Sequence, residues 1–178
     1  LATYSAYGPM FRTDILDGTD WDGKMESFED MEEYMDLVKA NRPEFEPLDM
    51  YSSGSEMDDL YMWNNGVYSL KGSSNDFLFI DPMEENPKIF TYYEYEKTPE
   101  FLEMMNRWNE KGFFSKSALS DTDSDKTKNG KAALKVHNVD TFTGLVIDKP
   151  EYSFDYANLV KDVSNMAFTQ DAMVISNT

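Results

Sequence analysis

Oxygen-bearing side chains occupy five consecutive positions at Asp121–Asp125, with aspartates at alternate places. This spacing opens a calcium-binding loop, which also needs a glycine at its sixth position and a bidentate glutamate at its twelfth. Lys126 and Ala132 occupy those two positions here, and three lysines fall within the loop. We therefore interpret the segment as the polar, capped start of a helix, and we predict no metal site.

Histidine occurs once, at His137, and cysteine does not occur. One histidine cannot form a zinc cluster, and a serine triad would need a nucleophile on a sharp turn, for which no G-x-S-x-G motif exists. Carboxylate pairs could serve a glycosidase, but among 34 acidic residues some pair lies at the right distance by chance. Glycine-rich phosphate-binding motifs are also missing from the sequence. We predict no catalytic residue, no cofactor and no enzymatic activity, and we expect His137 to make ordinary hydrogen bonds near a strand end.

The charge of the chain is lopsided, with 34 acidic against 16 basic residues and a formal net charge of -18. Such a surface repels the phosphates of nucleic acids and the headgroups of anionic lipids. No apolar run approaches the roughly 18 residues of a membrane span. The sequence thus argues against a nucleic-acid partner and against direct insertion of this chain into a membrane.

Helical periodicity is clear in two segments and weaker in two more. Ser27 and Asp30 are typical of a helix cap, and apolar residues then recur at helical spacing to about Ala40. Thr98 as a cap and Pro99 at the first position open a helix that ends at Gly112. The weaker helical patterns span residues 56–64 and 120–128. The inward face of the helix after Thr98 is expected to carry Phe101, Leu102, Met105 and Trp108.

Short extended segments alternate with these helices, which makes the chain α/β in class. The expected strands are residues 48–51, 77–80, 88–96, 132–136, 152–155 and 172–175. Both ends of the chain also look extended, and no signal peptide is present. We interpret residues 1–178 as a single α/β lobe, an internal fragment of a longer protein.

Aromatic residues near expected strand ends and loops provide the remaining candidate chemistry: Tyr7, Phe11, Tyr51, Trp63 and Phe142. Aromatic faces pack against the C–H faces of sugars, while nearby Asn, Asp, Ser and Glu side chains bond the hydroxyls. Trp63 lies on an expected helix among apolar neighbours, which favours a core position. Tyr51 and Phe142 lie where a strand runs into a polar segment, the usual place for ligands in open α/β sheets.

Three segments, taken in order, resemble the extracellular solute-binding proteins of bacterial ABC importers, particularly the carbohydrate-type family that includes maltose-binding protein. The first is Phe11–Leu16 with Met25–Met31, similar to the family's Y-N-K-D-L-F and P-x-T-W-D-E-L stretches. The second is Trp108–Phe114, similar to W-Y-x-K-G-L. The third is Asn129–Val136, similar to F-x-x-G-K-A-A-M-x-V.

The resemblance implies a type II periplasmic-binding-protein-like fold, with a central mixed sheet flanked by helices, of which this chain would be the second lobe. It implies capture of a small solute, a sugar or oligosaccharide, by hinge closure, and its delivery to the membrane permease of an ABC importer. It also implies an extracellular, cell-surface location with a lipid anchor in the parent protein. The alternative is a secreted glycan-active enzyme or a carbohydrate-binding surface domain. The sequence shows no recognisable set of catalytic residues, which argues against the enzyme.

The resemblance further implies two ligand-contacting segments, each after a strand, which we expect to meet at one edge of the sheet. Asp140 stands where a sugar-stacking tryptophan would be expected, which leaves peptides or modified glycans open as ligands. Weaker candidates lie near the expected hinge, at Tyr7 and Phe11. The first segment contains Tyr51, Ser52, Ser53 and Glu56, and the second contains Asn138, Asp140, Thr141 and Phe142.

Overall fold

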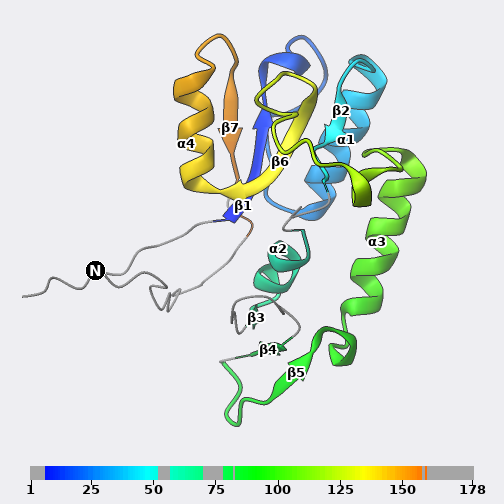
Figure 1. Cartoon of the computed structure of the whole chain (residues 1–178), viewed down its shortest axis with the longest axis vertical. Coiled ribbons are helices and arrows are strands. Elements are labelled where there is room, and N and C mark those ends of the chain that lie inside the picture. The colour runs from blue at the N-terminus through cyan, green and yellow to red at the C-terminus, as the bar shows by residue number, and fades with distance from the viewer. Residues whose placement is uncertain (1–6, 52–56, 70–77, 82, 158, 160–178) are drawn as a thin grey trace, which may run out of the picture.

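The chain forms four α-helices and seven strands within the residues that the structure describes. The structure is a computed structural model that describes residues 7–51, 57–69, 78–81, 83–157 and 159 (Figure 1). The helices are α1 (Phe28–Asn41), α2 (Met57–Asn64), α3 (Thr98–Lys111) and α4 (Val139–Asp148). The strands are β1 (Tyr7–Arg12), β2 (Glu46–Leu48), β3 (Tyr68–Ser69), β4 (Leu78–Ile80), β5 (Ile89–Thr91), β6 (Ala132–Asn138) and β7 (Phe154–Tyr156). Short 3-10 helices are found at Asp14–Leu16, Tyr92–Glu94 and Ala118–Ser120.

A mixed four-stranded sheet with the order β2-β6-β1-β7 lies at the centre. β2 runs parallel to β6, whereas β1 is antiparallel to both of its neighbours. The β6 segment Ala132–Val136 is buried throughout, as expected for a strand covered on both faces. The α/β class and the central mixed sheet are therefore confirmed.

Helices cover both faces of this sheet, as predicted. Phe11 of β1 points to one face, where its ring contacts Tyr34 of α1. Met10 points to the other face together with its register partner Tyr156, because side chains alternate along a strand. The ring of Tyr156 lies 5.5 Å from that of Phe142 in α4. Helices α1 and α4 thus lie on opposite sides of the sheet (Figure 1).

Helix α3 lies beside α1 and is joined to it by a charged cluster. Glu32 of α1 is 2.7 Å from both Arg107 and Lys111 of α3. The same carboxylate accepts a hydrogen bond of 2.8 Å from the indole of Trp108, which is fully buried in the core. Gly112 ends the helix with a φ of 69°, as its place in the sequence predicted.

A smaller sheet, β3-β4-β5, and helix α2 extend beyond the lower edge of the central sheet in Figure 1. Met62, Val67 and Phe79 form its own buried apolar cluster. Aromatic side chains cover this cluster, with the rings of Phe90 and Tyr95 stacked at 5.5 Å. None of the helices in the described residues combines the length and apolar character that crossing a membrane requires.

Several element boundaries differ from the sequence predictions. Ser27 caps α1 as predicted, accepting a hydrogen bond of 3.1 Å from the Asp30 amide. Thr98 is not a cap but the first helical residue, and its hydroxyl donates to the carbonyl of Tyr92. The inward face of α3 carries Phe101, Met104 and Trp108, whereas Leu102 is 53% exposed and Met105 is half-buried.

The expected helix at residues 120–128 is wrong. Asp121 accepts a hydrogen bond from the amide of Asp123, and Asp123 accepts one from the amide of Asp125. Such local turns compete with helical hydrogen bonding. The expected strand at 88–96 ends at Thr91, where Glu94 accepts a hydrogen bond from the Thr91 amide and a 3-10 turn begins. The strand expected at 172–175 lies outside the described residues.

Candidate functional site

The carboxyl ends of β2 and β6 meet at one edge of the central sheet, the lower edge in Figure 1. The strand expected at 48–51 lies earlier in the chain, because its pairing with β6 begins at Glu46 and β2 ends at Leu48. The Asp49 amide still donates to the carbonyl of Leu134, so the chain leaves the sheet beside the middle of β6. β1 begins at the same edge, where Tyr7 is the register partner of Asn138.

The segment Asn138–Phe142 belongs to helix α4 rather than to a loop. The Asn138 side chain caps the helix by accepting a hydrogen bond of 2.9 Å from the Thr141 amide. Asp140 is exposed in the first turn, where the helix dipole favours a carboxylate even without a ligand. The asparagine cap and the apolar residues that follow at helical spacing were the signals in the sequence that could have revealed this helix.

The structure describes the side chains of only some of the remaining candidate residues. Tyr51 and Phe142 are half-buried at the sheet edge and on α4, respectively. Phe11 is a core residue with 2% exposure, and its ring lies between Trp21 and Tyr34 at 5.6 and 5.5 Å. A ligand cannot reach that ring without opening the core, so Phe11 drops out of the candidate site. Ser52, Ser53 and Glu56 lie outside the described residues, and only the backbone of Tyr7 is described.

Lys135 is a buried cation at this edge that the sequence analysis did not select. It lies in β6 and is only 8% exposed. Its ammonium donates a hydrogen bond of 2.6 Å to the carbonyl of Ser124 and lies 5.1 Å from the centre of the Tyr51 ring. A lysine inside the apolar run Ala132–Val136 is costly unless its charge is satisfied, and this was the available signal.

His137 follows at the end of β6 and behaves as an ordinary polar residue, as expected. Its Nδ1 accepts a hydrogen bond from the amide of Asn138 and lies 2.9 Å from the hydroxyl of Thr141. Burial lowers the pKa of this imidazole below its usual range, and the nearby ammonium of Lys135 lowers it further. The ring is therefore neutral at pH 7.

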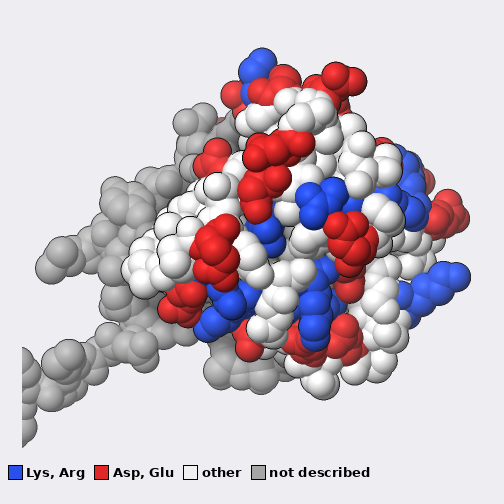
Figure 2. All heavy atoms as spheres, turned by 90° about the horizontal axis from the view of Figure 1, so that it is seen from above, with Lys and Arg blue, Asp and Glu red and all other residues white. Residues whose placement is uncertain are grey.

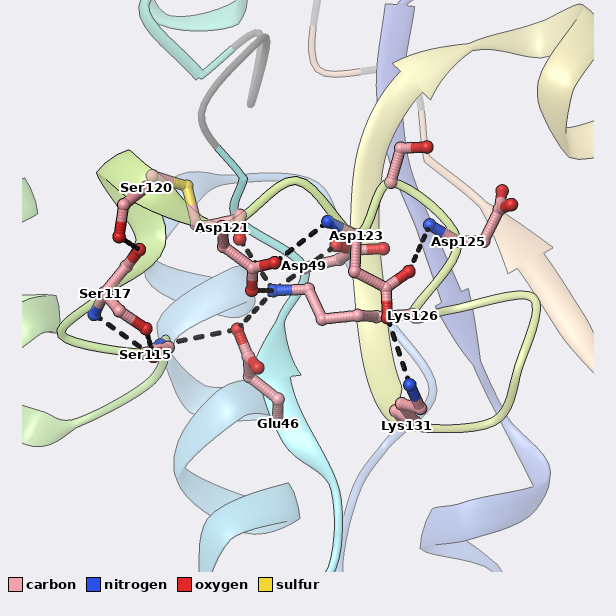
Figure 3. Close-up of polar contacts among 12 residues, drawn as sticks. Glu46, Asp49, Ser115, Ser117, Ser120, Asp121, Asp123, Asp125, Lys126 and Lys131 are labelled. Carbon is pink, nitrogen blue, oxygen red and sulfur yellow. Dashed lines mark hydrogen bonds and ion pairs between the residues drawn. The ribbon is translucent and has the colours of Figure 1, made fainter.

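A second buried cation, Lys126, joins the loop before β6 to the end of β2 (Figure 3). Its ammonium lies 2.9 Å from Glu46, 3.1 Å from Asp121 and 3.8 Å from Asp49. Burial lowers the pKa of Lys126, but the hydrogen bonds to Glu46 and Asp121 outweigh burial and raise the pKa above its usual range. The network thereby fixes the loop against the strand that leads to Tyr51.

Asp49 is the acid at the centre of this network. Its side chain is fully buried, and one carboxylate oxygen accepts hydrogen bonds from the amide and the hydroxyl of Thr127. Burial raises the pKa of Asp49, although the charges of Lys135 and Lys126 oppose the rise. Its role here is to hold the loop that contains Thr127.

The aspartates at positions 121 and 123 are paired with lysines. Asp121 lies 3.1 Å from Lys126, and Asp123 lies 3.0 Å from Lys131 (Figure 3). Across the described part of the chain, no group of three or more His, Asp or Glu side chains is placed to hold a metal ion. The segment therefore forms a series of turns held by lysines, and not the polar start of a helix that the sequence analysis expected.

The surface at the other end of the central sheet, the upper end in Figure 1, carries charges of both signs. Figure 2 views the molecule from above, onto that opposite end, and shows acidic and basic side chains interleaved on this face. No continuous basic stripe of the kind that nucleic-acid binding requires is seen on this face.

No family model and no curated protein matches the chain. Solved structures do share its fold. The N-glycan transport solute-binding protein NgtS from Streptococcus pneumoniae, in complex with Man1GlcNAc, matches with a TM-score of 0.64 at 15% identity. A sugar transporter from Bacillus licheniformis in complex with stachyose matches with a TM-score of 0.56 at 11% identity. The alginate-binding protein AlgQ2 without calcium ion matches with a TM-score of 0.58 at 14% identity.

The matches cover 87%, 84% and 86% of this chain, but only 34%, 38% and 32% of the three proteins, respectively. The chain therefore spans about a third of the length of each. At these identities the likeness establishes the fold alone, which is that of part of a type II solute-binding protein.

Proposed function

We propose that this chain is one lobe of an extracellular solute-binding protein that captures a carbohydrate for a bacterial ABC importer. The observation that carries the proposal is the shared fold, which extends over most of this chain in an N-glycan transport protein, a sugar transporter and an alginate-binding protein. The parent protein is extracellular and lipid-anchored in this proposal, and its closed form docks on the membrane permease.

The ligand would lie at the edge where β2 and β6 end. Ligands of open α/β sheets bind outside the carboxyl ends of the strands. Tyr51 supplies a ring for the C–H face of a sugar, and the first turn of α4 supplies Asn138, Asp140 and Thr141 for its hydroxyls. The other lobe would complete the cleft, and a ligand that contacts both lobes stabilises the closed form.

Binding by the full-length protein is the direct test. Purified protein is screened against neutral and acidic oligosaccharides by thermal shift, and hits are measured by calorimetry. Tyr51→Ala and Asp140→Ala should each weaken binding at least about tenfold, or 1.4 kcal/mol, with the melting temperature of the free protein nearly unchanged. A full-length protein that binds no carbohydrate contradicts the proposed function. Unchanged affinity in both variants removes this edge as the site but leaves the family assignment open to other evidence.

A further inference from the structure

A pocket of about 220 Å³ lies between α4 and the loop that contains residues 124–128. It is on the α4 face of the sheet and does not belong to the edge described above. Pockets for drug-sized ligands measure roughly 300–1,000 Å³, so this one suits a single ring-sized group. Thr141 lines it and also belongs to the segment at the sheet edge, so the pocket and the edge are contiguous.

The walls of the pocket combine buried polar groups with one apolar residue. Thr127 and Lys135 are 1% and 8% exposed, and Leu145 is 6% exposed. An ammonium has three donors, and among the described residues only the Ser124 carbonyl accepts a hydrogen bond from Lys135. The Lys135 ammonium, which also lies 5.1 Å from the centre of the Tyr51 ring, is part of the pocket wall, and Leu145 adds an apolar surface to it.

The pocket lining contains equal numbers of positively and negatively charged side chains. Two lysines, Lys128 and Lys135, face two aspartates, Asp125 and Asp148, and Lys128 lies 2.9 Å from Asp148. A lining with equal numbers of cations and anions favours a neutral ligand that both donates and accepts hydrogen bonds. A sugar ring has this character, whereas a phosphate or a carboxylate would face two like charges.

Gly144 is one of the residues that line the pocket. It lies in the middle of α4, where glycine costs about 1 kcal/mol relative to alanine. A glycine in a helix is often explained by close packing, yet a Cβ built at Gly144 would meet no atom within 4 Å. The missing side chain leaves open space at a residue that lines the pocket.

We propose that this pocket binds one neutral sugar ring and extends the binding edge along α4, so that the ligand is an oligosaccharide of at least two rings. The inference rests on the proposed function for its ligand class. The pocket itself is formed wholly by this chain, so it can be tested without the rest of the parent protein.

The test measures binding of glucose, galactose, mannose and N-acetylglucosamine to the 178-residue chain by NMR shift perturbation, with glucuronate as the charged comparison. We expect millimolar binding of at least one neutral sugar, with perturbed signals at Thr127, Lys135 and Leu145. Gly144→Met adds a large side chain to the lining of the pocket and should reduce this binding at least tenfold. Thr143→Met adds the same side chain on the exposed side of the helix and should leave binding unchanged.

Three results overturn the inference. The first is no binding of any neutral sugar, the second is unchanged binding by Gly144→Met, and the third is tighter binding of glucuronate than of the neutral sugars. If the full-length protein still binds an oligosaccharide that Tyr51→Ala weakens, only the pocket is rejected. If the full-length protein binds no carbohydrate at all, the proposed function is rejected as well. Circular dichroism of Gly144→Met and Thr143→Met verifies that both variants fold.

Discussion

The ammonium of Lys135 lies 5.1 Å from the centre of the Tyr51 ring. This contact joins the middle of β6 to the segment after β2, which are far apart in the sequence. It also places a buried cation beside His137, the single histidine of the chain. The pKa of that histidine therefore reports on Lys135.

Removing the charge of Lys135 should raise the pKa of His137. Burial lowers this pKa below 6.5 and the Lys135 ammonium lowers it further, so Lys135→Met removes the second cause and leaves the first. We expect the pKa to move up but to stay below 6.5. An NMR titration of the imidazole measures it without ambiguity, because no other histidine is present. Lys131→Met, which removes an exposed lysine paired with Asp123, is the control and should change nothing.

The lowered pKa of His137 also predicts how the stability of the fold changes with pH. The folded-state pKa of His137 is lowered, so folding favours the neutral ring. This contribution is present above the unfolded pKa of about 6.5 and is lost as the pH falls through the folded pKa. His137→Gln should therefore flatten the stability profile on the acid side of pH 6.5, measured by urea unfolding. An unchanged acid limb would contradict the burial of the imidazole.

Glu32 links α1 to α3 and should stabilise the fold both through its negative charge and through the oxygen atoms that accept hydrogen bonds. Hydrogen bonds from Arg107, Lys111 and Trp108 lower the pKa of Glu32 to about 2, with burial opposing them. Its contribution to stability is present above the unfolded pKa of about 4.3 and is lost as the pH falls toward 2.

Glu32→Gln removes the charge but keeps an acceptor for the Trp108 indole, whereas Glu32→Ala removes both. We expect Glu32→Ala to be less stable than Glu32→Gln by about 1–3 kcal/mol at neutral pH, because Trp108 is fully buried and would lose its partner. Chemical unfolding at pH 7 and at pH 3 measures both effects. Equal stability of the two variants would show that the indole finds another acceptor.

Sequence patterns identified the fold where local signals and burial agreed. Ser27 and Gly112 mark helix ends by capping chemistry that depends on nearby residues alone, and the structure has both ends there. The helix at Val139–Asp148 was missed because its asparagine cap was assigned to a ligand-binding turn. The prediction of a helix at 120–128 was wrong because aspartate side chains there accept hydrogen bonds from nearby backbone amides and form turns.

The buried polar network at the candidate site could not be predicted from the sequence. Lys126 is one of several lysines in a polar segment, and nothing local marks it as 4% exposed. Its burial follows from contacts with Glu46, 80 residues away, and with the carbonyl of Met50, 76 residues away. Tertiary contacts of this kind determine which of many similar charges become buried.

Gly8 is required by close packing at the start of β1, near the candidate site. A Cβ at this position would lie 1.8 Å from the carbonyl oxygen of Ala157, a backbone atom that cannot rotate away. The neighbouring Ala157 amide donates to the carbonyl of Pro9. Gly8→Ala should therefore separate the end of β7 from β1 and lower stability by several kcal/mol.

Gly144→Ala is the matched control for this glycine substitution. Nothing lies within 4 Å of its added Cβ, and alanine favours the helix by up to about 1 kcal/mol. Thermal unfolding should therefore shift downward for Gly8→Ala and slightly upward for Gly144→Ala. Destabilisation of similar size in both variants would contradict the difference in packing.

The isolated chain should bind the carbohydrate of the full-length protein far more weakly than that protein does. If each lobe makes about half of the contacts, a micromolar complex with about 8 kcal/mol of binding free energy leaves about 4 kcal/mol for one lobe, which is near millimolar. Calorimetry of chain and full-length protein with the same oligosaccharide measures the difference, which we expect to approach a thousandfold. The control is Tyr51→Ala in both proteins, which should weaken each by a similar factor because the ring contributes the same contact in both. Equal affinity of chain and full-length protein would mean that the whole site lies in this chain, and capture by closure of two lobes would then be rejected.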